Sequence, residues 1–456
     1  MAGFFQILAI RPLVDRGGVP HAVDVTRVEP RARPLRTRVH WAWLVAATAF
    51  VTLIGAAGFR AVPGVLIDPL HEEFGWSRAT ISAAVSVNLV LFGLISPFAA
   101  ALMDRLGMRR VVAGALVLVA AGSGLTVFMT ASWQLVLCWG VLVGAGTGSM
   151  SMAFVATVTG RWFVRHRGLV SGILTAAGAT GQLVFLPLVA ALATAHGWRT
   201  PALVVAAAAL AVVPLVLGLL RDHPGDVGTT AYGATPEEVT TAGPVTGSSA
   251  ARAVRALTTA ARTRTFWLLA GGFAICGAST NGLVGTHFIT AAHDHGMPHT
   301  TAASLLALIG VFDVAGTVFS GWLTDRVDPR LLLGAYYTLR GLSLVILPAL
   351  FAPETEPSMW VFILFYGLDW IATVPPTVAL ANKRFGRDVG LVAFGWIFGA
   401  HQIGAAVAAL GAGAIRDTQG SYDMAWYFAG GLCVVAALLS FAIRPIRDAL
   451  GAETRS

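Results

Sequence analysis

Charged residues are scarce in this chain. Only 12% of its 456 residues are charged and 56% are hydrophobic, and the mean hydropathy is +0.73. An ordinary soluble domain carries about 25% charged residues. The scarcity therefore argues against a soluble fold and indicates that lipid is the solvent for much of the chain.

Cysteine is rare as well. The three cysteines, Cys138, Cys276 and Cys433, lie inside apolar runs and lack the spacing of metal ligands. We interpret them as small core residues rather than as a disulfide or zinc framework.

Catalytic motifs are missing. The sequence has no His-x-x-Glu-His motif, no nucleophile elbow and no glycine-rich loop that would cradle a phosphate. We therefore expect no enzyme activity, no cofactor and no metal site. One external loop groups four residues with metal-binding side chains, and a solvated turn is the simpler interpretation of it. These residues are His293, Asp294, His295 and His299.

What the chain has instead is apolar runs of membrane-spanning length. A spanning helix needs about 20 apolar residues, and twelve such runs are present. They predict an all-α integral membrane protein of twelve transmembrane helices, six in 41–220 and six in 265–444. We expect 1–40 to be a basic disordered tail, 221–264 a flexible cytoplasmic linker with a basic amphipathic patch, and 445–456 a second tail. The runs are roughly 41–66, 80–102, 110–130, 133–158, 168–194, 200–220, 266–290, 300–323, 331–351, 358–381, 390–414 and 424–443.

The distribution of arginine predicts the orientation. If the N-terminus is cytoplasmic, the cytoplasmic segments hold 26 of the 31 Lys and Arg residues, and the outer segments hold only Arg78, Arg199 and Arg416. Basic residues concentrate on the cytoplasmic side of membrane proteins, so both termini are predicted to be cytoplasmic. Because the positive charge lies between apolar runs, it also argues against a nucleic-acid partner. A single lysine and abundant Ala and Gly indicate a bacterial protein of the plasma (inner) membrane.

A short polar turn occurs twice. The pattern Leu-x-Asp-Arg ends two apolar runs, 221 positions apart, and another apolar run begins within a few residues of each. Such a repeat indicates two related halves. The residues of the two turns are Asp104, Arg105, Gly107, Arg109, Asp325 and Arg326.

Two six-span halves with these turns resemble the major facilitator superfamily of transporters. In that family the turns lock two six-helix bundles together on the cytoplasmic side. An Asp at a helix end can accept hydrogen bonds from a neighbouring helix N-terminus and pair with Arg, and these contacts break as the bundles rock. The alternative is that both turns carry only topology charges.

The loop between the fourth and fifth spans resembles, more narrowly, the monocarboxylate transporters. It has an aromatic pair, a basic cluster and a helix with spaced glycines, which would let the fifth span approach a neighbour closely. In the second half Asp313 matches an Asp of that branch, but Thr317 stands where an Arg is expected and Gly64 where a substrate-linked Lys is expected. Bacterial relatives of the branch include oxalate/formate exchangers. The matched loop residues are Trp162, Phe163, Arg165, Arg167, Gly172, Gly178 and Gly181.

Several polar residues fall deep inside predicted spans. Arg340, for example, lies ten residues past Arg330, or about 15 Å at the helical rise, which is the centre of a ~30 Å hydrocarbon core. An unpaired charge there is costly, so each such residue is a functional hypothesis. The candidates for the substrate and proton pathway are Arg60, Asn88, Gln182, Asp313, Arg340, Asp369, His401 and Gln402.

Four of these residues have expected roles. Asp369 is the best-placed carboxylate, because the resemblance puts span ten beside the cavity. Arg340 is more simply an ion-pair partner of Asp313 or Asp369 than a substrate ligand. His401 would either relay a proton or serve as a buried structural histidine. Arg60 would either attract a carboxylate substrate or extend to the membrane interface.

These features predict a monomeric secondary transporter. We expect it to move a small organic anion, a monocarboxylate or a related acid, by alternating access, coupled to protons or by exchange. The alternative is drug or metabolite efflux by proton antiport. Members of that kind usually carry a Gly-Pro motif late in span five, which residues 178–187 lack.

Overall fold

The computed structural model describes residues 39–235 and 249–445. Within these ranges every regular element is a helix, apart from one isolated bridge between Phe163 and Tyr232. The described helices belong to one compact unit that begins at His40. The all-helical prediction is confirmed, whereas most of the two predicted tails lies outside the described residues.

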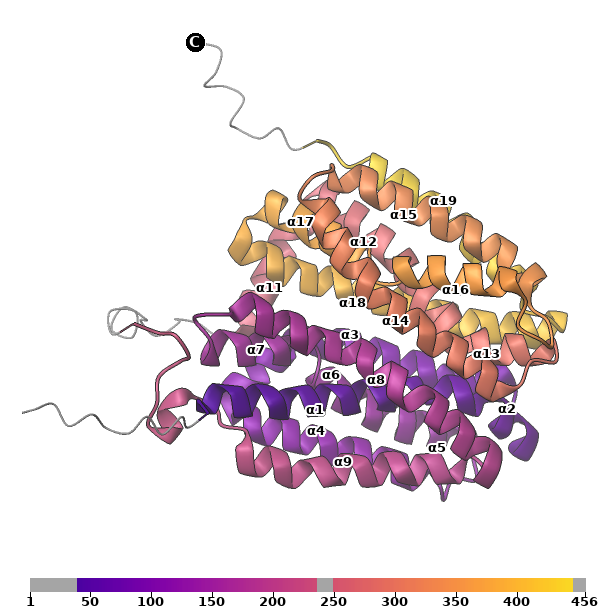
Figure 1. Cartoon of the computed structure of the whole chain (residues 1–456), viewed down its shortest axis with the longest axis horizontal. Helices are drawn as coiled ribbons and strands as arrows, with labels where there is room; N and C mark the ends of the chain where they lie inside the picture. Colours follow the sequence, from indigo (N-terminus) through magenta and orange to yellow (C-terminus); the bar gives the residue numbers. More distant parts are fainter. Residues whose placement is uncertain (1–38, 236–248, 446–456) are drawn as a thin grey trace, which may run out of the picture. The chain divides into compact units, whose positions relative to one another are not determined.

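The N-terminal half is the group of helices coloured indigo to magenta in Figure 1. Local sequence sets where its helices begin and end. Ser77 begins α3 by accepting a hydrogen bond from the amide of Thr80, and Gly107 ends it with a φ of 88°. The elements are α1 (Trp41–Ala61), α2 (Pro63–Phe74), α3 (Arg78–Leu106), α4 (Met108–Thr126), α5 (Ser132–Leu135), η1 (Val136–Val143), α6 (Gly144–Ser149), α7 (Met152–Trp162), α8 (Arg167–His196) and α9 (Arg199–Leu219).

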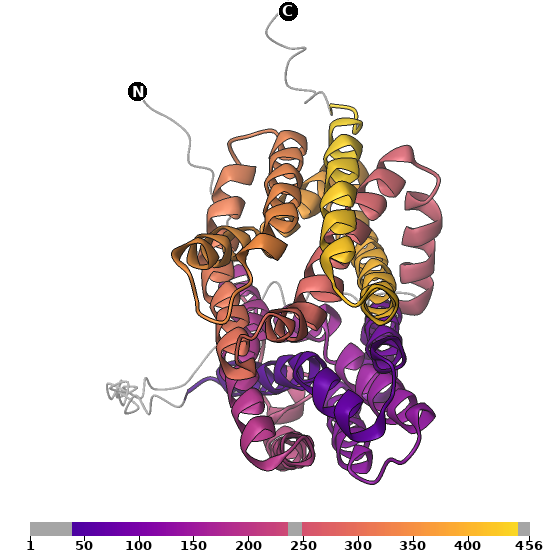
Figure 2. The same cartoon turned by 90° about the vertical axis from the view of Figure 1, so that its right-hand side faces the viewer.

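The C-terminal half, orange to yellow, forms the second group, and Figure 2 shows both groups from another side. One of its spans, α15, also begins with a side-chain cap. The carboxylate of Asp328 accepts a hydrogen bond from the amide of Arg330, and Pro329 occupies the first helical position. The elements are α12 (Arg264–Gly277), η3 (Ala278–Val284), α13 (Gly285–Asp294), α14 (His299–Thr324), α15 (Pro329–Ile346), η4 (Leu347–Leu350), α16 (Pro357–Asp369), α17 (Val374–Phe385), α18 (Arg387–Gln419) and α19 (Asp423–Phe441).

Ten spans among the described residues are long and apolar enough to cross a membrane. For α1 and α8 the described residues cover the apolar stretches Trp41–Ala56 and Phe185–His196, so the count of twelve stays a prediction. Several of the described spans are not continuous α-helices. The fourth and seventh contain the π-helical segments η1 and η3, and the tenth is interrupted between α16 and α17. Irregular backbone at such depth is tolerated where it faces a cavity or protein.

The described parts of the linker are folded. After α9 the chain forms a 3₁₀ turn, η2 (Pro224–Val227), and it continues after the gap as α11 (Ser249–Ala260). The helix α11 packs against both α3 and α18, with Ala253, Ala256 and Ala260 buried. The amphipathic patch predicted for this region therefore turns its apolar side to protein.

Polar contacts join the two halves at the end that the arginine distribution predicts to be outer. The carboxylate of Asp68, in α2, accepts hydrogen bonds from Arg78 and from His299 of α14, each at 3.2 Å. Asp417, near the end of α18, accepts from the backbone amides of Arg78 and Ala79 at 3.0 and 2.8 Å, and so caps α3. We call these residues the outer closure.

Asp68 is suited to hold this closure as an anion. Burial by itself would raise the pKa of its carboxyl, but the hydrogen bond from His299 and the charges of Arg78 and His299 leave that pKa below its ordinary value. A carboxyl whose pKa is depressed contributes its stabilisation above the ordinary pKa and loses it as the pH falls through the depressed value. The Asp68 side chain is therefore an ionised hydrogen-bond acceptor at neutral pH.

Removing this charge should open the outer end. In a protein whose single cysteine is Cys276, a buried residue of α12, we expect Asp68→Asn to speed labelling by an impermeant maleimide from outside by several-fold. Glu73→Gln is the matched control, because Glu73 pairs with Arg199 inside the N-terminal half at 2.6 Å. Equal labelling rates in the Asp68 and Glu73 variants would contradict the assignment of the closure.

Candidate functional site

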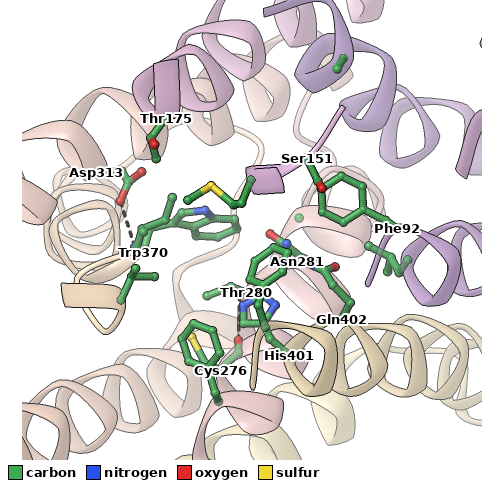
Figure 3. Close-up of a pocket in the computed structure, with 18 of the residues that line it drawn as sticks. Phe92, Ser151, Thr175, Cys276, Thr280, Asn281, Asp313, Trp370, His401 and Gln402 are labelled. Atoms are coloured by element: carbon green, nitrogen blue, oxygen red, sulfur yellow. Dashed lines mark hydrogen bonds between the residues drawn. The ribbon is translucent and has the colours of Figure 1, made fainter. Parts of the chain in front are cut away.

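A cavity of about 280 Å³ lies between the two halves (Figure 3). It is slightly smaller than the roughly 300–1,000 Å³ of sites for drug-sized ligands, so it suits a small molecule. Apolar and aromatic side chains form most of its wall, and polar side chains come from both halves. The polar lining residues are Asn88, Ser151, Thr175, Thr280, Asn281, Thr286, Asp313, Thr373, His401 and Gln402.

The predicted pathway residues fall into three groups. The cavity is lined by Asn88, Asp313, His401 and Gln402. Arg340 and Asp369 form a buried ion pair that is not part of the lining. The structure does not describe the side chains of Arg60 and Gln182.

Span ten is interrupted beside the cavity. The helix α16 ends at Asp369 and α17 begins at Val374, with turns between them, and Trp370 and Ile371 line the cavity. An interrupted helix leaves backbone amides and carbonyls without helical partners. At membrane depth these groups must find partners within the protein.

Buried charged side chains supply those partners. One carboxylate oxygen of Asp313, in α14, accepts a hydrogen bond from the amide of Ile371 at 2.9 Å. The guanidinium of Arg340, in α15, donates to the carbonyls of Asp369 and Trp370 at 2.6 and 3.3 Å. A cation thus lies at the C-terminal end of α16, as the helix dipole favours, and an anion binds the backbone of the interruption before α17.

Arg340 also forms an ion pair with the side chain of Asp369. The Nε to Oδ2 distance is 2.6 Å, and the Arg340 side chain is 0% exposed. Asp369, which we predicted to be the best-placed carboxylate, is held against Arg340 and is not part of the cavity wall. The carboxylate that lines the cavity is Asp313, which also accepts a hydrogen bond from the Thr317 hydroxyl at 3.1 Å.

The side chains of Asp313, Arg340 and Asp369 form one electrostatic unit, which we call the buried charge group. It contains two carboxyls and one guanidinium, so it carries one net negative charge when both carboxyls are ionised. Such a charge is costly inside a membrane. A single proton bound to either carboxyl removes it, and of the two carboxyls Asp313 is the one that faces the cavity.

The sequence analysis missed the contribution of span seven. Thr280 and Asn281 line the cavity from the π-helical segment η3. The hydroxyls of Ser279 and Thr280 donate to carbonyls of the preceding turn, including that of Cys276 at 3.0 and 2.7 Å. This competition with the backbone loosens a helix. The available signal was the polar stretch Ser-Thr-Asn-Gly within an apolar run, which carries no charge and so did not stand out.

His401 sits in an aromatic setting on span eleven. Its ring lies 4.8 Å from that of Phe273 and 5.6 Å from that of Phe398, measured between centroids. The three residues form part of the cavity wall. The two roles predicted for His401, proton relay and structural histidine, both stay predictions.

The loop between spans four and five anchors the linker. Trp162 and Phe163 are fully buried. The indole of Trp162 donates to the carbonyl of Arg221 at 3.2 Å, Phe163 forms the bridge with Tyr232, and Arg167 donates to the carbonyl of Phe163 at 2.9 Å. This motif lies apart from the cavity lining and ties the chain after α9 to the N-terminal half.

One expectation for this loop is wrong. Gly172 was expected to allow a close helix approach, yet a Cβ added there would meet nothing within 4 Å, because Gly172 lies on an exposed side of α8. The packing of Gly178 and Gly181 is outside the described part of the chain. Arg165 has a local role instead, since its stem covers Gly233, where an added Cβ would lie 2.3 Å from Arg165 Cγ.

The first Asp-Arg turn makes its described contacts within the N-terminal half and the adjoining linker. Asp104 pairs with Arg161 of α7. The backbone amide of Arg109 donates to Asp222 at 2.9 Å, so a linker residue caps α4 where the chain turns at Gly107. Contact of this turn with the other bundle stays a prediction.

The second turn is built differently. Asp328 pairs with Arg330 at 2.5 Å and caps α15, and Arg326 lies over the ring of Trp322 at 4.2 Å. Arg105 lies in the last turn of α3, and Asp325 is the residue that ends α14.

Breaking the buried ion pair should destabilise the protein strongly. We expect Arg340→Leu to cost about 3–5 kcal/mol of stability, because it leaves the Asp369 carboxylate buried without its partner. The double variant with Asp369→Leu should recover part of this loss, and thermal unfolding in detergent measures both. Arg416→Leu, which breaks a pair of partly exposed residues with Asp294, is the control and should cost about 1 kcal/mol or less. A double variant no more stable than Arg340→Leu would contradict the pairing.

Comparison with known proteins agrees with this architecture. Among solved structures, a bacterial homologue of the human lysosomal transporter Spinster, in an inward-facing and unoccupied conformation, has a TM-score of 0.69 at 14% identity and covers 89% of this chain and 97% of that one. The xylose transporter XylE from E. coli, in a partially occluded inward-open conformation, has a TM-score of 0.64 at 16% identity and covers 89% and 98%. These likenesses concern the fold.

Curated sequences extend the likeness to transporters. An uncharacterised MFS-type transporter of Bacillus subtilis, YcxA, is 25% identical over 397 residues, which are 85% of this chain and 91% of that protein. Monocarboxylate transporter 13 of Rattus norvegicus is 27% identical and covers 86% of both chains. Residues 48–392 and 282–455 match the family model of the Major Facilitator Superfamily. The chain therefore belongs to the major facilitator superfamily and is a multi-pass membrane transporter.

Proposed function

We propose that this transporter moves a small monocarboxylic acid together with a proton. The observation that carries the proposal is Asp313, a buried carboxyl that lines the cavity. Asp313 belongs to the buried charge group, which contains two carboxyls and only one guanidinium. The likeness to a monocarboxylate transporter supports the class of substrate.

The composition of the cavity favours an acid that crosses with its proton. Its described lining residues include no Arg and no Lys. A bare carboxylate would lose its hydration there without gaining a cationic partner, which is costly. An anion and a proton that cross together carry no net charge. Aromatic walls such as Phe92, Phe273 and Trp370 suit the organic part of the substrate.

In the proposed cycle the two halves rock around the cavity. Protonation of Asp313 neutralises the buried charge group, and substrate binding lets the outer closure and the cytoplasmic contacts alternate. With substrate on both sides the protonated carrier would exchange one acid for another. We place this cycle in a bacterial plasma membrane, in a monomer with both termini in the cytoplasm.

Arg60 has a proposed role in substrate capture. It follows Leu53 and Ala56, both cavity-lining residues of α1, by seven and four positions, which is a helical spacing. We propose that its charge attracts the carboxylate before the proton joins it. In that case Arg60→Gln should raise the KM for uptake and leave the maximal rate nearly unchanged.

Proton-driven efflux is the second candidate. A cavity with one carboxylate, aromatic walls and no described Arg or Lys in its lining also suits a hydrophobic cation. Proteoliposomes that ignore a panel of labelled mono- and dicarboxylates and instead export hydrophobic cations would favour this function.

Replacing Asp313 separates proton coupling from binding. The oxygen of an Asn side chain can still accept the Ile371 amide, so Asp313→Asn should fold normally. We expect it to lose accumulation driven by an inward-directed proton gradient, by tenfold or more for a general proton-transfer group. It should retain acid-for-acid exchange.

Uptake and counterflow in the same proteoliposomes measure the two activities. Asp423→Asn, in the first turn of α19 and outside the cavity lining, is the matched control. Unchanged gradient-driven uptake in Asp313→Asn would remove Asp313 from the coupling mechanism.

A further inference from the structure

The side chain of Gln402 has an unusual environment in the cavity wall. It belongs to α18, is 0% exposed and lines the cavity. Within residues 39–235 and 249–445, neither its amide nitrogen nor its amide oxygen has a hydrogen-bond partner. A buried polar group without a partner is destabilising, so such groups are rare unless a ligand or water completes them.

Packing holds this side chain in place. Gly93 of α3 lies against its base, since a Cβ added to Gly93 would approach Gln402 Cβ to 2.7 Å. Figure 3 shows Gln402 beside Asn281, on the side of the cavity opposite Asp313. The base of the Gln402 side chain is therefore held by the contact of the two halves, and its carboxamide is separate from the buried charge group.

A carboxamide offers one N–H donor and one C=O acceptor side by side in a plane. The complementary ligand group is planar with an adjacent acceptor and donor, as in a protonated carboxylic acid or a primary amide. An ionised carboxylate or an ester lacks the donor and would leave the Gln402 oxygen unpaired. Sites that hydrogen-bond a ligand group reject analogues without it, because their own buried groups then stay unpaired.

We infer that Gln402 is the residue that recognises the head group of the substrate, by a two-point pair with a protonated carboxylic acid or a primary amide. The part of this inference that names acids as substrates rests on the proposed function. It adds that the one proton taken up by Asp313 is passed on through the cavity to the substrate, so that the acid is bound in its neutral form, and that neutral primary amides bind as well.

Primary amides test this pairing without a proton gradient. Thermal stabilisation of the purified full-length protein in detergent would be measured with butyramide and benzamide, and with methyl butyrate and methyl benzoate as the analogues without a donor. A ligand that binds the folded state stabilises it in proportion to its affinity. We expect the wild-type protein to be stabilised by the amides and much less by the esters.

The variant Gln402→Leu should abolish the preference and weaken amide binding by about tenfold or more. Its own unfolding temperature should not fall, because leucine removes an unpaired polar group without opening a large cavity. Gln419→Leu, an exposed position on the same helix, is the matched control and should behave as wild type.

Three results would overturn the inference: equal binding of amides and esters by the wild-type protein, no binding of any of the four, or an unchanged preference in Gln402→Leu. Failure of the proposed function gives a different result. In that case the amide preference and its dependence on Gln402 remain, while gradient-driven acid uptake into proteoliposomes is absent.

Discussion

The contact between Arg340 and the interrupted span ten is the interaction on which the cavity depends. The guanidinium binds the Asp369 side chain and the carbonyls of Asp369 and Trp370, and Asp313 binds the amide of Ile371 within the interruption. Without these partners the unpaired backbone would be costly in a membrane interior, since Pro375 and Pro376 at the start of α17 keep the span from continuing as one helix. The charges therefore stabilise the opening that puts Trp370 and Ile371 into the cavity wall.

In the outer closure, too, a carboxylate accepts hydrogen bonds from backbone amides of another helix. Asp417 satisfies two amides at the start of α3, and Asp313 satisfies the amide of Ile371 in the interruption before α17. In both places a carboxylate from one helix binds backbone amides of another span that lack a helical partner. The contact in span ten lies within one half, whereas the contact of Asp417 with α3 joins the halves and must break when they rock.

Charge and hydropathy in the sequence were enough to predict the helical class, the places of most spans and the burial of Asp313, Arg340 and Asp369. Arg340 could be predicted to pair, because an isolated guanidinium at that depth is too costly. Its partner could not be chosen between Asp313 and Asp369, since that depends on which carboxyl faces the interruption and which faces the cavity. Asn281 and the interruption of span ten left too weak a signal, because neutral polar residues and prolines are common in membrane helices.

The helix α11 has a consequence for the speed of the transporter. It packs on α3 from one half and on α18 from the other, and the carbonyl of Ala253 accepts a hydrogen bond from Trp396 of α18 at 2.9 Å. A segment that binds both halves, at the end predicted to be cytoplasmic, resists a change in the angle between them. In the proposed cycle one of its two contacts has to be released in each turnover, so we expect the packing of Ala253, Ala256 and Ala260 and the hydrogen bond of Trp396 to slow transport.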